Sequence, residues 1–127
     1  MVEIKKFIIL PDKSRRPFFD GMETQSASFT FICALCGTLN VVDLWLFLDE
    51  SEKWLQNIGA EEAQKVRKIL QLPISSDFFM SHEGGCPYLN ICYCHHCREK
   101  YLLYVGFYEF QPARYFATLQ GVYKLTT

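Results

Sequence analysis

The chain lacks any apolar run long enough to cross a bilayer, which takes roughly 18 to 20 residues. Its most apolar stretch, Val41 to Leu48, is interrupted by Asp43. The N-terminus begins with charged residues, but the apolar run before Pro11 is too short for the hydrophobic region of a signal peptide. We therefore expect a soluble, cytoplasmic protein with no membrane partner.

The chain also lacks an excess of charge of either sign. Its 13 lysines and arginines face 14 aspartates and glutamates, which leaves a net charge of −1. Domains that bind nucleic acid through phosphates normally carry a basic excess, so this balance disfavours a dedicated nucleic-acid binder. The most basic segment is the loop from Lys13 to Arg16, and a local patch there would still fit a neutral total.

Familiar catalytic signatures are missing as well. The chain has no glycine-rich phosphate loop, no Gly-x-Ser-x-Gly elbow and no His-Glu-x-x-His helix. We therefore do not expect an enzyme. The chain has 127 residues, half of them hydrophobic. Residues 1–127 are therefore expected to form a single domain with a core of its own.

What the chain does contain is an aromatic content of 16%, which favours strands with half-buried surfaces. Ser28–Ile32 alternates small polar with large apolar side chains, the period of such a strand. We expect strands at Val2–Leu10, Ser28–Ile32, Thr38–Leu48, Tyr101–Phe110 and Tyr115–Leu125. The last two would form a hairpin around Gln111–Ala113, and Pro73–Tyr88 is predicted to be an irregular connection.

One or two helices are expected in the middle of the chain. Asp49 and Glu52 resemble a capping box, which predicts a helix near Glu50–Ile58 with Gly59 as its stop. A second helix is predicted at Ala60–Leu72. Its apolar residues share one face at helical spacing, and its charges run from acidic to basic, as the helix dipole favours.

Six cysteines are the most informative residues. In a reducing compartment they are expected to be metal ligands or buried thiols rather than disulfides. Four of them form two Cys-x-x-Cys pairs, and such spacing lets one tight turn present two thiolates to Zn²⁺. The predicted zinc ligands are Cys33, Cys36, Cys94 and Cys97. Buried free thiols, redox chemistry or another metal are the alternatives.

Two Cys-x-x-Cys turns, each following a strand-like segment, resemble the zinc-ribbon class of proteins. The resemblance extends only to the four cysteines and implies a knuckle at the end of each strand. Gly37 suits the left-handed backbone that a knuckle often needs, whereas Arg98 occupies the matching place in the second one. We predict an α+β fold: an antiparallel sheet, a zinc-ribbon-like centre, and one or two helices inserted between the knuckles.

Other residues near the second knuckle allow alternatives. His82, Cys86 and Cys92, with His95 or His96, would make a second zinc site, although their spacing matches no familiar ligand pattern. Cys92 could also replace Cys94 as a ligand. The two histidines inside the knuckle are expected to be exposed bystanders.

The aromatic segment after the second knuckle has apolar residues on both faces of its predicted strand. Either the strand is central and covered on both sides, or one face is a partner surface. Under the second interpretation, Tyr104, Tyr108 and Phe110 would contact the partner. The first interpretation is favoured, because continuous apolar strands are commonly buried on both sides.

These observations favour a non-catalytic, intracellular zinc-binding module that binds another protein, such as an inhibitor, an immunity protein or an adaptor. The alternative is a nucleic-acid-binding zinc ribbon, which would need its basic residues to gather on one face. A third interpretation, a zinc-dependent hydrolase, would need an open metal position and a carboxylate such as Glu83 aimed at it.

Overall fold

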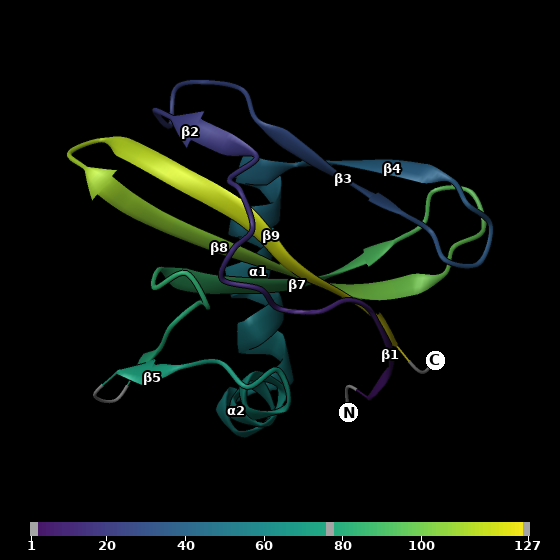
Figure 1. Cartoon of the computed structure of the whole chain (residues 1–127). Coiled ribbons are helices and arrows are strands. Elements are labelled where there is room, and N and C mark those ends of the chain that lie inside the picture. The colour runs from purple at the N-terminus through teal and green to yellow at the C-terminus, as the bar shows by residue number, and fades with distance from the viewer. Residues whose placement is uncertain (1–2, 76–77, 126–127) are drawn as a thin grey trace.

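The computed structural model describes residues 3–75 and 78–125, so that Val2 and Ser76, which fall in predicted segments, lie outside the described residues. Figure 1 shows how the elements are arranged. Their order along the chain is β1 (Ile4–Ile9), β2 (Phe19–Gly21), β3 (Ser28–Ile32), β4 (Leu39–Asp43), α1 (Leu44–Ile58), α2 (Ala60–Ile69), β5 (Ile74–Ser75), β6 (Phe78–Phe79), β7 (Cys86–Tyr93), β8 (Lys100–Gln111) and β9 (Arg114–Leu125).

The central element is a five-stranded antiparallel sheet in the order β1-β9-β8-β7, with β2 also paired to β9. The long strands β8 and β9 form the predicted hairpin around Pro112 and Ala113 (Figure 1). β3 and β4 form a separate two-stranded hairpin, and β5 pairs with β6. The predicted mixture of antiparallel strands and two helices is therefore confirmed.

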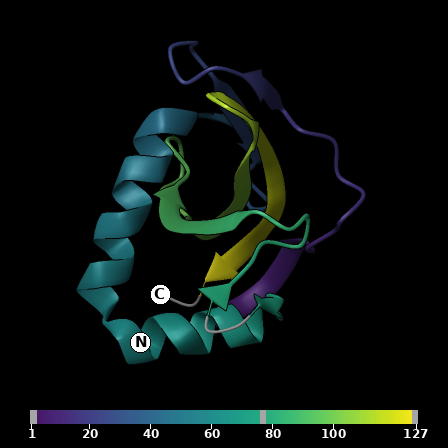
Figure 2. The same ribbon diagram turned by 90° about the vertical axis from the view of Figure 1, so that its left-hand side faces the viewer.

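Strand β8 is covered on both faces, as the favoured interpretation predicted. Its alternate residues Tyr101, Leu103 and Val105 join a first core with the β3–β4 hairpin and the start of α1. Leu102 and Tyr104 point the other way, into a second core with α2. Figure 2 shows the curled sheet with α1 along one side and α2 across its end. The sheet therefore separates two packed layers.

Helix α1 begins at Leu44, earlier than predicted, and the strand expected at Thr38–Leu48 ends at Asp43. The cap is the Asp43 carboxylate, which accepts a hydrogen bond from the Leu46 backbone N–H at 2.9 Å, so the predicted capping box at Asp49 is wrong. Buried positions at Leu44, Phe47 and Ser51 follow the helical period. This spacing outweighs the β-preference of the local residues.

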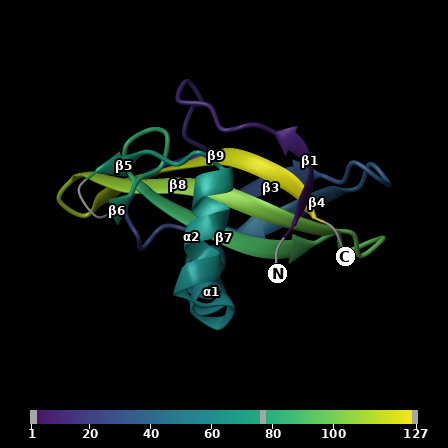
Figure 3. The same ribbon diagram turned by 90° about the horizontal axis from the view of Figure 1, so that it is seen from below.

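Helix α2 starts at Ala60, as predicted, and ends slightly early at Ile69. Gly59 separates the helices with a φ of 86°, a backbone conformation that glycine adopts readily. The predicted face of Ala63, Val66 and Leu70 is buried. Figure 3 shows α2 lying beneath the sheet. No helix in the described ranges is long and apolar enough to span a membrane.

The connection predicted to be irregular is more ordered than expected. It contains β5, β6 and the start of β7, and the short strand β2 was also not predicted. Helix α1 covers the outer edge of β7, because the Ser51 hydroxyl donates to the Leu89 carbonyl at 2.6 Å and accepts from the Leu89 N–H at 2.9 Å. These bonds satisfy backbone groups that an edge strand would otherwise expose.

Candidate metal centre

The four predicted ligands come together where two strand pairs turn. Cys33 and Cys36 lie in the β3–β4 turn, and Cys94 and Cys97 lie in the β7–β8 turn. Figure 1 shows these turns side by side at one end of the molecule, although they are far apart in the sequence. All four sulfur atoms lie within 4.8 Å of one another. We call the β3–β4 hairpin, together with both turns, the metal lobe.

The sulfur spacing fits a shared metal ion. Cys33 Sγ is 3.5 Å from Cys97 Sγ, and Cys36 Sγ is 3.6 Å from Cys94 Sγ. A tetrahedron with Zn–S bonds of 2.3 Å has sulfur–sulfur edges of about 3.8 Å. A disulfide would bring two sulfurs to about 2.05 Å, and all four cysteines are free. The cluster can therefore hold a metal without rearrangement of the turns.

The two turns have the same backbone design. The Cys33 carbonyl accepts from the Gly37 N–H, and the Cys94 carbonyl accepts from the Arg98 N–H, each at 2.9 Å. Each turn is closed by a second bond, in which the N–H of the first cysteine donates to the backbone carbonyl of the residue five positions later, also at 2.9 Å. Both cysteine pairs thus lie in tight turns with the same backbone pattern, which is compatible with the knuckles that the zinc-ribbon resemblance implies.

The fifth position of each turn has a left-handed backbone. Gly37 has φ 75°, and Arg98 has φ 67° despite its side chain. For a residue other than glycine this conformation costs roughly 1 kcal/mol or more. The Arg98 guanidinium lies 5.8 Å from the centre of the Tyr93 ring, and the residue directly follows Cys97, where a cation would suit the negative charge that four thiolates create.

Two polar side chains, Tyr101 and Thr38, contact the sulfur cluster from outside. The Tyr101 hydroxyl accepts from the Ala34 N–H at 2.9 Å and lies 3.2 Å from Cys33 Sγ, so that it can donate to the thiolate. The Cys36 thiol donates to Thr38 Oγ1 at 3.1 Å. Such outer contacts fix ligand orientation and tune a metal site.

Asn40 connects the two turns. It is buried on β4, donates to the Thr38 carbonyl at 3.2 Å, and accepts from the His95 N–H at 2.9 Å. One side chain therefore joins the first cysteine turn to the second. Neither Asn40 nor Tyr101 was identified from the sequence, since no spacing rule relates either residue to the cysteines.

The environment shifts the pKa values of Cys94 and Cys97 in opposite directions. Burial alone would raise the pKa of Cys94, but hydrogen bonds from the Cys97 backbone and the Asn40 side chain lower it to about 5. At Cys97 the Glu99 backbone favours the thiolate, but burial and the neighbouring sulfurs outweigh it and raise the pKa to about 12. Crowding of four sulfurs thus opposes full ionisation until a cation offsets their charge.

The alternative second zinc site is not formed among the described residues. Cys86 and Cys92 are six residues apart on β7, which separates them by about 20 Å along the strand. His82 Nδ1 instead lies 3.0 Å from the Tyr104 hydroxyl. Cys92 does not replace Cys94 in the sulfur cluster, and burial raises its pKa to about 11, as for an inert core thiol.

The requirements of a hydrolytic centre are not met at the sulfur cluster. Glu83 accepts from Ser81 Oγ at 2.6 Å and from Gln120 Nε2 at 2.9 Å, and belongs to a different part of the fold. His95 and His96 are both exposed, as expected for bystanders. The only cluster of potential metal ligands in the described residues is the set of four cysteines.

The tentative partner residues have different environments. Tyr104 is fully buried, so its assignment to a partner surface is wrong; its hydroxyl instead accepts from the His82 N–H at 2.9 Å. Tyr108 and Phe110 are half-buried near the β8–β9 turn and pack with Phe116. The rings of Phe110 and Phe116 are stacked, with their centroids 3.9 Å apart. Their role in partner binding stays a prediction.

No family model, curated protein or solved structure matches this chain. The resemblance to zinc ribbons therefore stands on the four cysteines and the geometry of their two turns.

Proposed function

We propose that this chain is a non-catalytic protein-interaction module whose binding surface is held in place by one structural Zn²⁺ ion. Zinc is favoured among metals because four thiolates in a tetrahedron are its usual structural ligand set. Four protein ligands also leave no position for water or substrate, unlike a catalytic zinc. Persistent thiolates fit the reducing interior of a cell.

The observation that carries this proposal is the exposed apolar face of the β3–β4 hairpin. Phe29 and Phe31 point inward and are buried, while Ile32, Leu39 and Val41 are 54 to 67% exposed on the other face. Ile32 pairs directly with Leu39 across the hairpin. Clustered apolar side chains in contact with water are typical of interaction sites.

A groove extends this face along the edge of β4. It has a volume of about 220 Å³ and is lined by β4, α1 and β7. Both the inward-facing Val42 and the outward-facing Val41 line it, so the groove follows the strand edge rather than one face. The edge is open among the described strands, where β4 pairs with β3 alone. An added strand would find unpaired backbone groups there.

The proposed occupant is an extended, apolar segment of another protein that carries a basic residue. Asp43 and Glu50 contribute the charged groups of the groove lining, Glu50 also pairs with Lys53 at 3.4 Å, and no lysine or arginine is among the described residues that line the groove. A lysine or arginine in the segment would complement these carboxylates. Inhibitors, immunity proteins and adaptors all work through contacts of this kind, and the groove does not distinguish between them.

A nucleic-acid partner has weaker support. The basic residues lie on different elements, with Arg98 in the β7–β8 turn and Arg114 next to the β8–β9 turn at the opposite end of the molecule (Figure 1). Arg114 is also engaged by Asp20 at 3.0 Å. Micromolar binding of DNA or RNA near 150 mM salt, falling steeply as salt rises, would favour this alternative over a protein partner.

The proposal is tested by selecting binding peptides from a displayed random library on the zinc-loaded protein. We expect apolar sequences with a basic residue, whose binding weakens at least tenfold in Val41→Glu, as for loss of an interface anchor. The matched control is Ile74→Glu, an equally drastic change at a residue that is 62% exposed on β5. Equal binding to both variants, or no enriched sequence, would contradict the proposed surface.

A further inference from the structure

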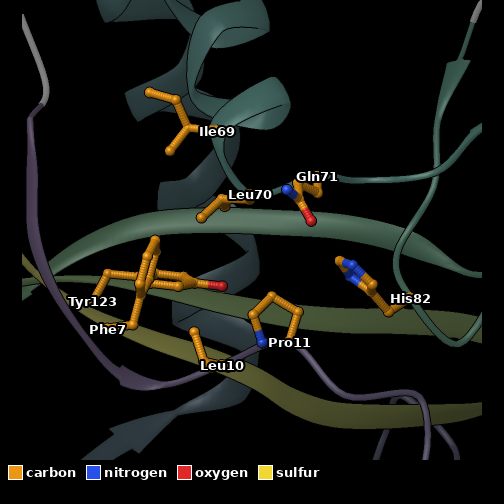
Figure 4. Close-up of a pocket in the computed structure, with 8 residues that line it drawn as sticks. All are labelled: Phe7, Leu10, Pro11, Ile69, Leu70, Gln71, His82 and Tyr123. Atoms are coloured by element: carbon orange, nitrogen blue, oxygen red, sulfur yellow. The ribbon is translucent and has the colours of Figure 1, made fainter.

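We propose a second binding site in the pocket beneath α2, for a small uncharged molecule with an aromatic body and one hydrogen-bonding group. The pocket lies on the opposite side of the sheet from the metal lobe and has a volume of about 260 Å³. Figure 4 shows its lining: Phe7, Leu10, Pro11, Ile69, Leu70, Gln71, His82 and Tyr123. These residues come from β1, the following loop, the end of α2 and the two residues after it, the turn before β7, and β9.

The mouth of the pocket is apolar and in contact with solvent. The side chains of Phe7, Leu10 and Ile69 are 46, 57 and 49% exposed. They come from β1, the loop after it and α2. Phe7 packs its ring edge-on against Tyr123 at 5.2 Å. Apolar walls with a few placed polar groups are the usual composition of sites for small molecules.

The polar anchor is the Tyr123 hydroxyl. It is sealed from solvent and has no hydrogen-bond partner, one of three such buried atoms among the described residues. An orphaned buried hydroxyl costs roughly 1 to 3 kcal/mol, so it calls for a specific explanation. Figure 4 shows this hydroxyl directed toward the middle of the lining residues, with the Gln71 side chain facing it from the end of α2.

Of the other two polar lining residues, Gln71 and His82, the histidine contributes a flat wall more than a free donor. Its Nδ1 lies 3.0 Å from the Tyr104 hydroxyl. Burial and the charge of Lys13 lower its pKa, which favours the neutral ring. A neutral ligand therefore suits the pocket better than an anion, and the Tyr123 hydroxyl and the Gln71 side-chain amide are the groups that would recognise it.

The pocket wall includes an irregular stretch of the central sheet. Strand β1 is an edge strand, and its pairing with β9 shifts between Ile4 and Lys6 and again between Phe7 and Ile9. Bulges of this kind re-aim side chains and are common beside functional sites. The second shift lies next to the Phe7–Tyr123 pair, which forms one side of the pocket.

The size of the pocket indicates the size of the ligand. A closed apolar cavity of about 150 Å³ accommodates benzene. A pocket of about 260 Å³ should therefore accept a two-ring aromatic molecule. Naphthalene and 2-naphthol are suitable probes, because they share one apolar body and differ only in the hydroxyl that Tyr123 would recognise.

The experiment compares both probes with the zinc-loaded wild-type protein and Tyr123→Phe, using protein-detected NMR titration. We expect 2-naphthol to bind the wild type at least fivefold more tightly than naphthalene, and this preference to disappear in Tyr123→Phe. Ile69→Trp should block both probes by filling the mouth. The matched control is Leu46→Trp, at an exposed residue of α1 outside this pocket, and it should bind both probes like the wild type.

Two outcomes would overturn the proposal. One is that neither probe causes saturable shifts at its solubility limit, which would mean that the pocket does not take up a two-ring aromatic molecule. The other is that 2-naphthol keeps its preference in Tyr123→Phe while that variant retains the wild-type melting temperature. Neither result depends on the metal lobe, so the proposed partner surface is tested separately.

Discussion

The two layers that flank the central sheet are held by different forces. On one side, the metal lobe buries one face of a two-stranded hairpin and exposes apolar residues on the other. On the other side, α2 buries Val66 and Leu70 against Leu102 and Tyr104. A hairpin of two strands is marginal by itself, whereas a packed helix draws on apolar burial.

This difference indicates what a bound metal would add to a small fold. Coordination by four cysteines from two distant turns would replace a larger apolar contact, so that the outer face of the hairpin does not have to be buried. In the proposed function that face binds a partner, and the metal preserves its shape. Substitutions in the two layers should therefore affect metal binding and stability in different combinations.

The largest effect is expected for Cys94→Ser, which removes a buried ligand. Structural zinc contributes on the order of 10 kcal/mol, comparable to the whole stability of a domain. The variant should lose zinc and its cooperative thermal transition, as measured by metal analysis and circular dichroism. Cys86→Ser, at an exposed cysteine outside the cluster, should retain both. An unchanged transition in Cys94→Ser would refute the structural role.

The second layer is tested by Leu102→Ala. Leu102 is fully buried in the core beneath α2, and truncation of such a residue costs about 2 to 5 kcal/mol. Chemical denaturation should show this loss in the free energy of unfolding. The folded variant should still bind one zinc ion, because the residue contacts the second core. Loss of zinc without loss of stability would contradict the separation of the layers.

A finer test removes one tyrosine hydroxyl from each core. Tyr101→Phe deletes the bonds to Ala34 and Cys33 and should weaken zinc binding by tenfold or more, measured by competition with a chelator. Tyr123→Phe deletes a hydroxyl without a partner and should leave zinc affinity unchanged and stability equal or slightly higher. Equal zinc affinity in both variants would remove the support assigned to Tyr101.

The smallest effect concerns the left-handed residue of each cysteine turn. Arg98→Gly should raise the unfolding free energy by about 0.5 kcal/mol, because glycine relieves the strained backbone. Gly37→Ala should lower it by about 1 kcal/mol for the converse reason. Thermal melts of the two variants would check these signs. A destabilised Arg98→Gly would mean that the arginine's charge near the thiolates outweighs the backbone strain.

The sequence predicted most reliably what depends on local spacing. The four cysteines, the buried face of α2 and the hairpin after the second knuckle all follow from short motifs or simple periods. The start of α1 was missed because Val41, Val42 and Trp45 favour strands, while the helical spacing of Leu44 and Phe47 is visible only once Asp43 is recognised as a cap.

Features that depend on tertiary contacts could not be predicted. From the sequence alone, Tyr104 could lie on the surface as well as in the core. It is buried because α2 and the turn that carries His82 cover it. Asn40 and Tyr101 support the sulfur cluster through contacts between segments far apart in the sequence. The open edge of β4 likewise results from the separate pairing of β3 with β4.

The most direct test of the central claim is metal analysis of freshly purified protein combined with X-ray absorption at the zinc edge. The four-cysteine geometry predicts one zinc ion per chain, surrounded by four sulfur atoms at about 2.3 Å. A folded protein without zinc, or a zinc shell that contains nitrogen or oxygen in place of one of the sulfurs, would contradict it.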